Sequence, residues 1–401
     1  MTIQNNQNLS LGAHYEQVAG KFRAIFQRIA EGALEREKNR ILPYEPIQWL
    51  KQAGFGAVRV PVAFGGDGVS QRQLFQLLIE LAKADSNVVQ ALRGHFAFVE
   101  DRLNAHKTEP QTLWFERFVK GDLVGNAWTE IGNVEIGDVA TRVTESQSGN
   151  LVVNGQKYYS TGTIFADWIS VRALDPEGHV IIAIVPKNSE GLEVIDDWNG
   201  FGQRTTASGT VKLTNVIVDP FLILDERKLN NSPNFRGAYS QLIQVAIDVG
   251  IAEAAYDDTL SAIRKARPIV DANVEKASFE HYTLQEIGKL RILLDAAILL
   301  LDEAAEELDY LEQVNELTDE LTSQASIRVA EAKVYANDAA LIISEKLLEL
   351  GGSRSSLKEH NLDQHWRNAR VHTLHDPVRW KLYAIGNYYL NHKIPSNHAW
   401  I

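Results

Sequence analysis

Two long helical patterns in the C-terminal half constrain the fold of this chain most strongly. Residues 285–311 and 318–350 carry apolar side chains at helical spacing and are rich in Ala, Leu and Glu. Each exceeds about 25 residues, and helices of that length normally pack side by side as an antiparallel bundle. Gly351 and Gly352 follow the second pattern and predict its end, because glycine readily terminates a helix.

The N-terminal part also has a helical pattern. Tyr15–Arg40 carries apolar residues at intervals of three and four with charges between them. Ser70 is placed to cap a helix over Gln71–Ala84. Between these helices, Gly54–Pro61 is expected to form a short extended piece.

From about residue 121 to residue 223, apolar and polar residues alternate as they do in strands. The clearest runs are 151–155, 168–171, 180–185 and 210–213. Asn154-Gly155 and Asp175–Gly178 indicate turns. We therefore predict a mainly α protein with a central β-domain: an N-terminal helical domain (1–121), a β-domain (122–225) and a C-terminal helical bundle (226–401).

Composition argues against several classes of function. A net charge of −12 argues against a nucleic-acid partner, because phosphate backbones attract basic surfaces. No run of about 18 apolar residues predicts a membrane span. Met1–Ser10 lacks the basic start and apolar core of a secretory signal, so we expect a cytoplasmic protein.

Sulfur content is unusually low. The chain has no Cys, and Met1 is its only Met. The lack of Cys rules out disulfides, thiolate nucleophiles and Cys-ligated metals. Resistance to oxidation, economy under sulfur scarcity and compositional drift each account for this, and the sequence leaves all three open.

Several short stretches, in this order and spacing, resemble the motifs of the acyl-CoA dehydrogenase family across nearly the whole chain. They are Gly125–Glu130, Asn154–Gly162 followed by Ala166-Asp167, Gly202–Ser208, Val216–Pro220 and Leu350–Gly352. The resemblance implies an N-terminal helical domain, a β-barrel-like middle domain and a C-terminal four-helix bundle. It also implies a homotetramer.

The C-terminal region departs from the dehydrogenase pattern. Many acyl-CoA dehydrogenases carry a Glu there that removes the α-proton of a thioester. The matching stretch, Trp366–Pro377, offers the imidazoles of His372 and His375 instead, with Asp376 as an alternative base. The tail is similar to the flavin monooxygenases of this superfamily, of the dibenzothiophene monooxygenase and sulfone-metabolism type.

That resemblance implies a set of site residues. The implied catalytic residues are His375, Ser160, His95 and His372, with His375 placed to hydrogen-bond a flavin peroxide and move its proton. The implied cofactor-binding residues are Asn126, Trp128, Ser160, Arg267, Gly351, Gly352 and His375. Arg267 matches an Arg that reaches a flavin phosphate, commonly in a neighbouring subunit, and Arg204 is a further candidate for the flavin. Each of these residues also has a purely structural interpretation.

No metal site is expected, because His372 and His375 lack a carboxylate-rich partner motif. The resemblance implies a monooxygenase that uses reduced FMN (FMNH2) and O2, through a C4a-hydroperoxyflavin, on a small organosulfur substrate. A separate NAD(P)H:flavin reductase is expected, since no GxGxxG strand-turn-helix unit is visible. The cofactor choice of FMN or FAD stays open. The alternatives are an FAD-dependent acyl-CoA dehydrogenase, an N- or aromatic hydroxylase, and a catalytically silent scaffold.

Overall fold

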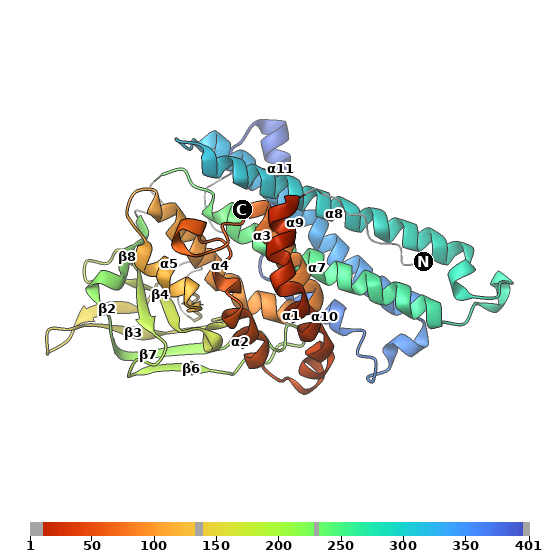
Figure 1. The fold of residues 1–401 in the computed structure, drawn as a ribbon, viewed down its shortest axis with the longest axis horizontal. Helices are drawn as coiled ribbons and strands as arrows, with labels where there is room; N and C mark the ends of the chain where they lie inside the picture. Colours follow the sequence, from red (N-terminus) through yellow and green to blue (C-terminus); the bar gives the residue numbers. More distant parts are fainter. Residues whose placement is uncertain (1–10, 133–138, 228–231, 396–401) are drawn as a thin grey trace.

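A computed structural model describes residues 11–132, 139–227 and 232–395. The strands gather at one end of an elongated molecule, and three long helices extend toward the other end (Figure 1). The N-terminal helices lie between these two parts. This arrangement is the predicted acyl-CoA dehydrogenase-like fold, mainly α with a central sheet.

Residues 11–132, the part of the N-terminal region that the structure describes, contain five α-helices. They are α1 (Gly12–Asn39), α2 (Tyr44–Gln52), α3 (Gln71–Ala84), α4 (Ser86–His106) and α5 (Thr112–Val119). The predicted cap at Ser70 is confirmed, because its hydroxyl accepts from the N–H of Gln73 and the Gln73 side chain accepts from the N–H of Ser70.

The expected extended piece at Gly54–Pro61 is wrong. Phe55–Ala57 forms a 3₁₀ turn, entered through Gly54 at a positive φ of 79°. Phe55 is fully buried and packs edge-on against Phe22 and Phe96. A tight turn closes its own backbone hydrogen bonds inside this aromatic core, whereas an extended piece would need a neighbouring strand there.

The central sheet has eight strands. They are β1 (Val124–Ala127), β2 (Arg142–Glu145), β3 (Leu151–Lys157), β4 (Trp168–Leu174), β5 (Val180–Pro186), β6 (Leu192–Ile195), β7 (Thr210–Ile217) and β8 (Ile223–Asp225). The hydrogen-bonded order is β6-β7-β3-β2-β4-β5-β8, with β1 parallel to β4. Alternate Val, Ile, Leu and Ala side chains form an apolar core inside it.

The turn predicted at Asn154-Gly155 is also wrong. Both residues lie inside β3, where the pairing with β7 shifts between Val153 and Gly155. A Cβ on Gly155 would lie 2.2 Å from Oγ1 of Thr141. Glycine here serves a bulge and a close packing contact instead of a hairpin.

The C-terminal region contains α7 (Arg236–Lys265), α8 (His281–Gln313), α9 (Asp319–Leu350), α10 (Gln364–His372) and α11 (Arg379–Asn391). Helix α9 ends at Gly351 as expected, and Gly352 has a positive φ of 67°. Apolar residues of α1, α3 and α4 share one continuous core with α7, α8 and α9. The three domain limits drawn from the sequence stay a prediction. None of the helices described here is both long and apolar enough to cross a bilayer.

The loop after β3 is held against α4 by a backbone-to-backbone contact. Gly162 has a φ of 72°, and a Cβ built on it would lie 1.8 Å from the carbonyl oxygen of Ala91. Only glycine allows this approach. The contact fixes Ser160, two residues earlier, relative to α4.

We predict that Gly162→Ala destabilises the protein by about 1–3 kcal/mol or more, since it adds a clash to the strain of a positive φ. Chemical denaturation measures the loss. Gly178→Ala is the matched control, because Gly178 also has a positive φ but no atom within 4 Å of its Cβ position. Equal losses in the two variants would contradict the proposed close contact.

Candidate functional site

The candidate site is built around helix α4, which contacts both β1 and α7. Near the start of this helix, Ser86 Oγ accepts from the side-chain amide of Gln203 at 3.2 Å. The side-chain oxygen of Asn87 accepts from the backbone N–H of Thr205 at 3.3 Å. Helix α4 therefore holds the 203–206 loop, the Ser160 loop and β1 in one place.

Ser160 is buried in the loop that follows β3. Its backbone N–H donates to the carbonyl of Gly209 at 3.0 Å. Its hydroxyl has no hydrogen-bond partner among the described residues. A buried polar group without a partner costs about 1–3 kcal/mol, so this hydroxyl suits a ligand that supplies one. The flavin contact expected of Ser160 stays a prediction that this geometry favours.

Asn126 and Trp128 lie on the same face of β1 and its continuation. The backbone of Asn126 is fixed by Thr163, and its half-buried amide lies where a side chain on Gly94 would otherwise stand. The indole N–H of Trp128 donates to Ser170 at 3.2 Å, and its ring packs in an apolar cluster. The geometry favours Asn126 for ligand contact and a packing role for Trp128.

His375 lies in the turn between α10 and α11. Its Nε2 is 3.2 Å from Nη2 of Arg93, and its Nδ1 is 3.3 Å from the amide nitrogen of Gln244. The side chain is 35% exposed, so part of it is accessible from solvent. Burial of the rest of the ring and the charge of Arg93 lower the pKa of His375 to about 4. The ring is therefore neutral at pH 7.

A chain of buried polar groups lies behind His375. The side-chain oxygen of Gln244 accepts from Nζ of Lys333 at 2.8 Å, and Nζ is 3.5 Å from Asp248. Asp248 accepts from Nδ1–H of His372 at 2.5 Å. Burial alone would raise the pKa of Asp248, but His372 and Lys333 hold it below its ordinary value. His372 thus faces the helical core and supports the site from behind.

Asp376 is also buried beside His375. Its carboxylate lies 3.4 Å from Nδ1 of His375 and 3.2 Å from Nζ of Lys381. Burial would raise the pKa of Asp376, but His375, Lys333 and Lys381 together hold it below its ordinary range. The carboxylate is therefore ionised and weakly basic.

His95 is placed differently from the role expected for it. Its ring is buried between Phe96 and Phe118, and burial lowers the pKa of His95 to about 4. Nε2 is 2.9 Å from the carbonyl oxygen of Gly56, and Nδ1 accepts from the N–H of Val124 at 3.2 Å. With both nitrogens bonded to the backbone, the geometry favours a structural role in joining α4 to β1.

Arg267, Gly351 and Gly352 lie far from His375. Helix α7 runs from Gln244 at the site to Lys265, which is about 30 Å at 1.5 Å per residue. Gly351 packs against Ala262 near that remote end. Arg267 is exposed there. Within one chain these residues do not join the cluster around Ser160 and His375.

Arg204 is committed to a structural contact. Its guanidinium donates to the carbonyl of Glu37 at 2.5 Å and to that of Lys38 at 3.4 Å. These are two of the last carbonyls of α1, which need donors. The geometry favours a helix-capping role.

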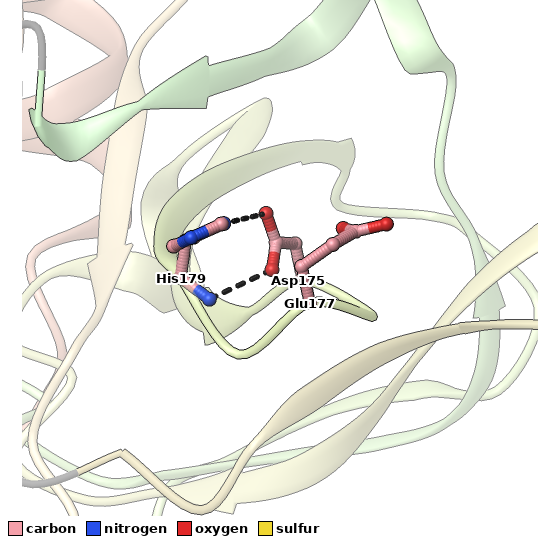
Figure 2. A group of neighbouring side chains, drawn as sticks. All are labelled: Asp175, Glu177 and His179. Carbon is pink, nitrogen blue, oxygen red and sulfur yellow. Dashed lines mark hydrogen bonds and ion pairs between the residues drawn. The ribbon is translucent and has the colours of Figure 1, made fainter.

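Figure 2 shows one cluster with metal-ligating side chains, Asp175, Glu177 and His179 in the β4–β5 turn. Asp175 accepts from both the backbone and the ring of His179, at 2.7 and 3.2 Å. These bonds account for the turn, and Glu177 and His179 are exposed, so no metal site is assigned. Asp175 also lines a cavity of about 330 Å³, which none of the predicted site residues lines.

Sequence reasoning missed Arg93, Gln244, Asp248 and Lys333. A signal existed for two of them, since Gln244 and Asp248 stand four residues apart inside the apolar run Leu242–Ile251. Such a spacing places both on one face of a buried helix, where polar groups need partners.

The chain belongs to the acyl-CoA dehydrogenase superfamily. Residues 13–122 match the model of the acyl-CoA dehydrogenase N-terminal domain, and residues 242–380 match that of the C-terminal domain. These matches confirm the family expected from the short motifs.

Two curated relatives are similar over almost their full length. The dibenzothiophene monooxygenase of Mycolicibacterium goodii is 28% identical and is covered over 99% of its length by 98% of this chain. The probable FMNH2-dependent monooxygenase SfnC of Pseudomonas putida is 28% identical, with 93% of this chain and 95% of SfnC covered.

Two solved structures share the whole fold. FMN-bound TdsC of Paenibacillus sp. A11-2 superposes with a TM-score of 0.90 at 27% identity, covering 96% of this chain and 100% of TdsC. The methanesulfinate monooxygenase MsuC of Pseudomonas fluorescens superposes with a TM-score of 0.86 at 27% identity, covering 96% of this chain and 99% of MsuC. These neighbours agree with the expectation of a flavin-dependent monooxygenase.

We predict that the His375 imidazole titrates near pH 4, not near 6.5, because burial and Arg93 disfavour its charged form. An NMR titration of the ring signals measures this, with His375→Gln used to assign the resonance. A His375 titration midpoint near 6.5 would contradict the predicted effect of burial and of Arg93 on the ring.

Proposed function

We propose that this chain is a monooxygenase that uses reduced FMN and O2 to oxygenate a small organosulfur compound. The neutral, partly exposed His375 ring, held by Arg93 of the same helix α4 that the Ser160 loop packs against, is the observation that carries the proposal. The near full-length similarity to FMN-dependent monooxygenases supports it. A chain with no Cys and one Met also suits synthesis under sulfur scarcity.

The described residues fit a flavin. The unpartnered Ser160 hydroxyl and the Asn126 amide suit the polar edge of the ring. Reduced FMN would supply two electrons, so that one atom of O2 enters the substrate and the other leaves as water. His375 would accept a hydrogen bond and transfer a proton near the reacting oxygen, while Gln244 holds its orientation.

The dehydrogenase alternative fits the site less well. Removal of an α-proton needs a carboxylate of sufficient basicity. Asp376, the nearest candidate, is buried against Lys381 with a pKa below its ordinary range, so its basicity is weak.

Reduced flavin would come from a separate NAD(P)H-dependent reductase. Across the described ranges, the mostly antiparallel sheet offers no βαβ unit of the kind that binds nicotinamide cofactors. We infer a cytoplasmic location because such a reductase and its NAD(P)H must be available.

We also infer a homotetramer whose flavin site uses two subunits. The remote position of Arg267 requires a second chain if it binds the same cofactor as Ser160. Large apolar side chains exposed on α8 and α11 are suited to subunit contact. They are Tyr282, Leu284, Ile292, Leu299 and Tyr310 on α8, and Trp380, Leu382, Tyr383, Tyr389 and Leu390 on α11.

We predict that His375→Ala lowers the yield of oxygenated product by about 100-fold or more, because a positioned acid–base group contributes at least that much. FMN binding stays nearly intact, and H2O2 release per FMNH2 oxidised rises. Anaerobic mixing with FMNH2 followed by an O2 pulse, with product and peroxide quantified, measures both. His179→Ala, on the distant hairpin, is the control. Full product yield in His375→Ala would remove this residue from the chemistry.

We predict that Arg267→Ala and His375→Ala subunits complement each other. Each variant alone is impaired, but a co-expressed hybrid regains sites that combine His375 of one chain with Arg267 of another. Purification through two different affinity tags isolates the hybrid, and its turnover is compared with that of each parent. A hybrid no more active than its parents would contradict the shared site.

A further inference from the structure

Arg93 is a largely buried cation at the site without a carboxylate partner. No Asp or Glu of the described ranges lies within ion-pair distance of it, and its Nε is buried without a hydrogen-bond acceptor. Arg36 and Arg59, by contrast, are buried against Asp85 and Glu100. Burial lowers the pKa of Arg93, and only the more distant Asp376 opposes that effect.

Among the described residues, the hydrogen bond between Arg93 and His375 satisfies only part of the guanidinium. The Asp376 carboxylate lies 3.4 Å from Nδ1 of His375 and can only accept from it, so the ring carries its proton on Nδ1 and its single lone pair on Nε2. That lone pair accepts from Nη2 of Arg93 at 3.2 Å. The buried Nε–H of Arg93 is left in need of an acceptor.

The charges around His375 do not cancel. Arg93, Lys333 and Lys381 supply three positive charges, and Asp248 and Asp376 supply two negative charges. The lysines and both carboxylates are paired with one another. The excess positive charge therefore lies on Arg93, beside Nε2 of His375.

We propose that Arg93 binds the charge of an anionic substrate, so that the site accepts a small organic sulfinate in preference to a neutral thioether or thiophene. This inference rests on the proposed oxygenase function. The guanidinium fork matches two oxygens of such an anion. When it turns toward them, it leaves Nε2 of His375, whose lone pair becomes available beside the reacting atoms.

A sulfinate suits the chemistry because its sulfur still carries a lone pair that can accept an oxygen atom. The balanced reaction is RSO2⁻ + FMNH2 + O2 → RSO3⁻ + FMN + H2O. A sulfur–oxygen bond forms and the O–O bond breaks. Sulfur and flavin are oxidised, O2 is reduced, and the two hydrogens of FMNH2 leave in water.

The test compares Arg93→Gln with the wild type, using methanesulfinate as the anionic probe and dibenzothiophene as the neutral one. We expect KM for methanesulfinate to rise roughly 10- to 100-fold, as for loss of a charged hydrogen bond. Affinity for FMNH2 and KM for the neutral probe are unchanged, whereas kcat for both probes reflects the altered His375, and Arg93→Lys restores part of the sulfinate affinity. The pKa of His375 rises in Arg93→Gln, because a cation beside the ring is removed.

A binding measurement without turnover accompanies the kinetics. Methanesulfinate should raise the Tm of the wild type and leave that of Arg93→Gln unchanged. Arg102→Gln is the matched control, since Arg102 lies on the same helix, is buried and, among the residues that the structure describes, donates a hydrogen bond to a glutamine at 3.2 Å and to no carboxylate. It should keep the wild-type response to the anion.

Three outcomes distinguish failure of the anion-binding inference from failure of the proposed oxygenase function. If the wild type couples FMNH2 oxidation to no sulfur substrate, the proposed function fails. If it oxygenates dibenzothiophene while sulfinate neither binds nor reacts, the oxygenase stands and the anion site is overturned. If Arg93→Gln weakens FMNH2 binding and leaves sulfinate KM unchanged, Arg93 serves the charge of the reduced flavin, and the inference is likewise overturned.

Discussion

The buried ion pair of Lys333 and Asp248 is the interaction on which the site depends most. It joins α9 to α7 in the middle of an apolar bundle, where a charge is tolerated only when its remaining hydrogen bonds are satisfied. Gln244 and His372 satisfy them. Because the Gln244 oxygen is committed to Lys333, its NH2 group is fixed toward His375. The packing of the bundle therefore fixes the hydrogen-bonding neighbours of the His375 ring, although His375 itself lies in the turn between α10 and α11.

This arrangement decides which chemistry the turn favours. A dehydrogenase of this superfamily needs a basic carboxylate over its substrate, but the carboxylate here is stabilised in its ionised form by Lys381 and lies buried. Burial of the imidazole and the Arg93 guanidinium beside it disfavour the charged form of the ring more than the nearby Asp376 favours it. A neutral acceptor beside a cation is poorly suited to carbon deprotonation. Together, the neutral imidazole and the cation are better suited to binding an anion and to transferring a proton to or from an oxygen atom.

The sequence predicts the fold well and the site only in part. Local periodicity and backbone preference can be recognised in the sequence itself. They predict the long helices, the Ser70 cap and the helix end at Gly351. The turn predicted at Asn154-Gly155 was wrong because a sequence does not distinguish a glycine required at a β-bulge from one required at a turn. His95 looked available because sequence does not show that Gly56 and Val124 occupy its nitrogens. Arg93 was missed because its significance is the absence of a carboxylate, which only the folded arrangement reveals.

The distribution of the flavin-related residues bears on assembly. Helices α7 and α9 run in the same direction, since Lys333 meets Asp248 at one level and Gly351 meets Ala262 at another. Arg267 and Gly352 therefore lie toward the bundle end remote from Gln244, about 30 Å away along α7. If Arg267 and Ser160 bind the same flavin, as proposed, two chains must contribute to each site. The exposed apolar side chains of α8 and α11 are surfaces suited to that contact.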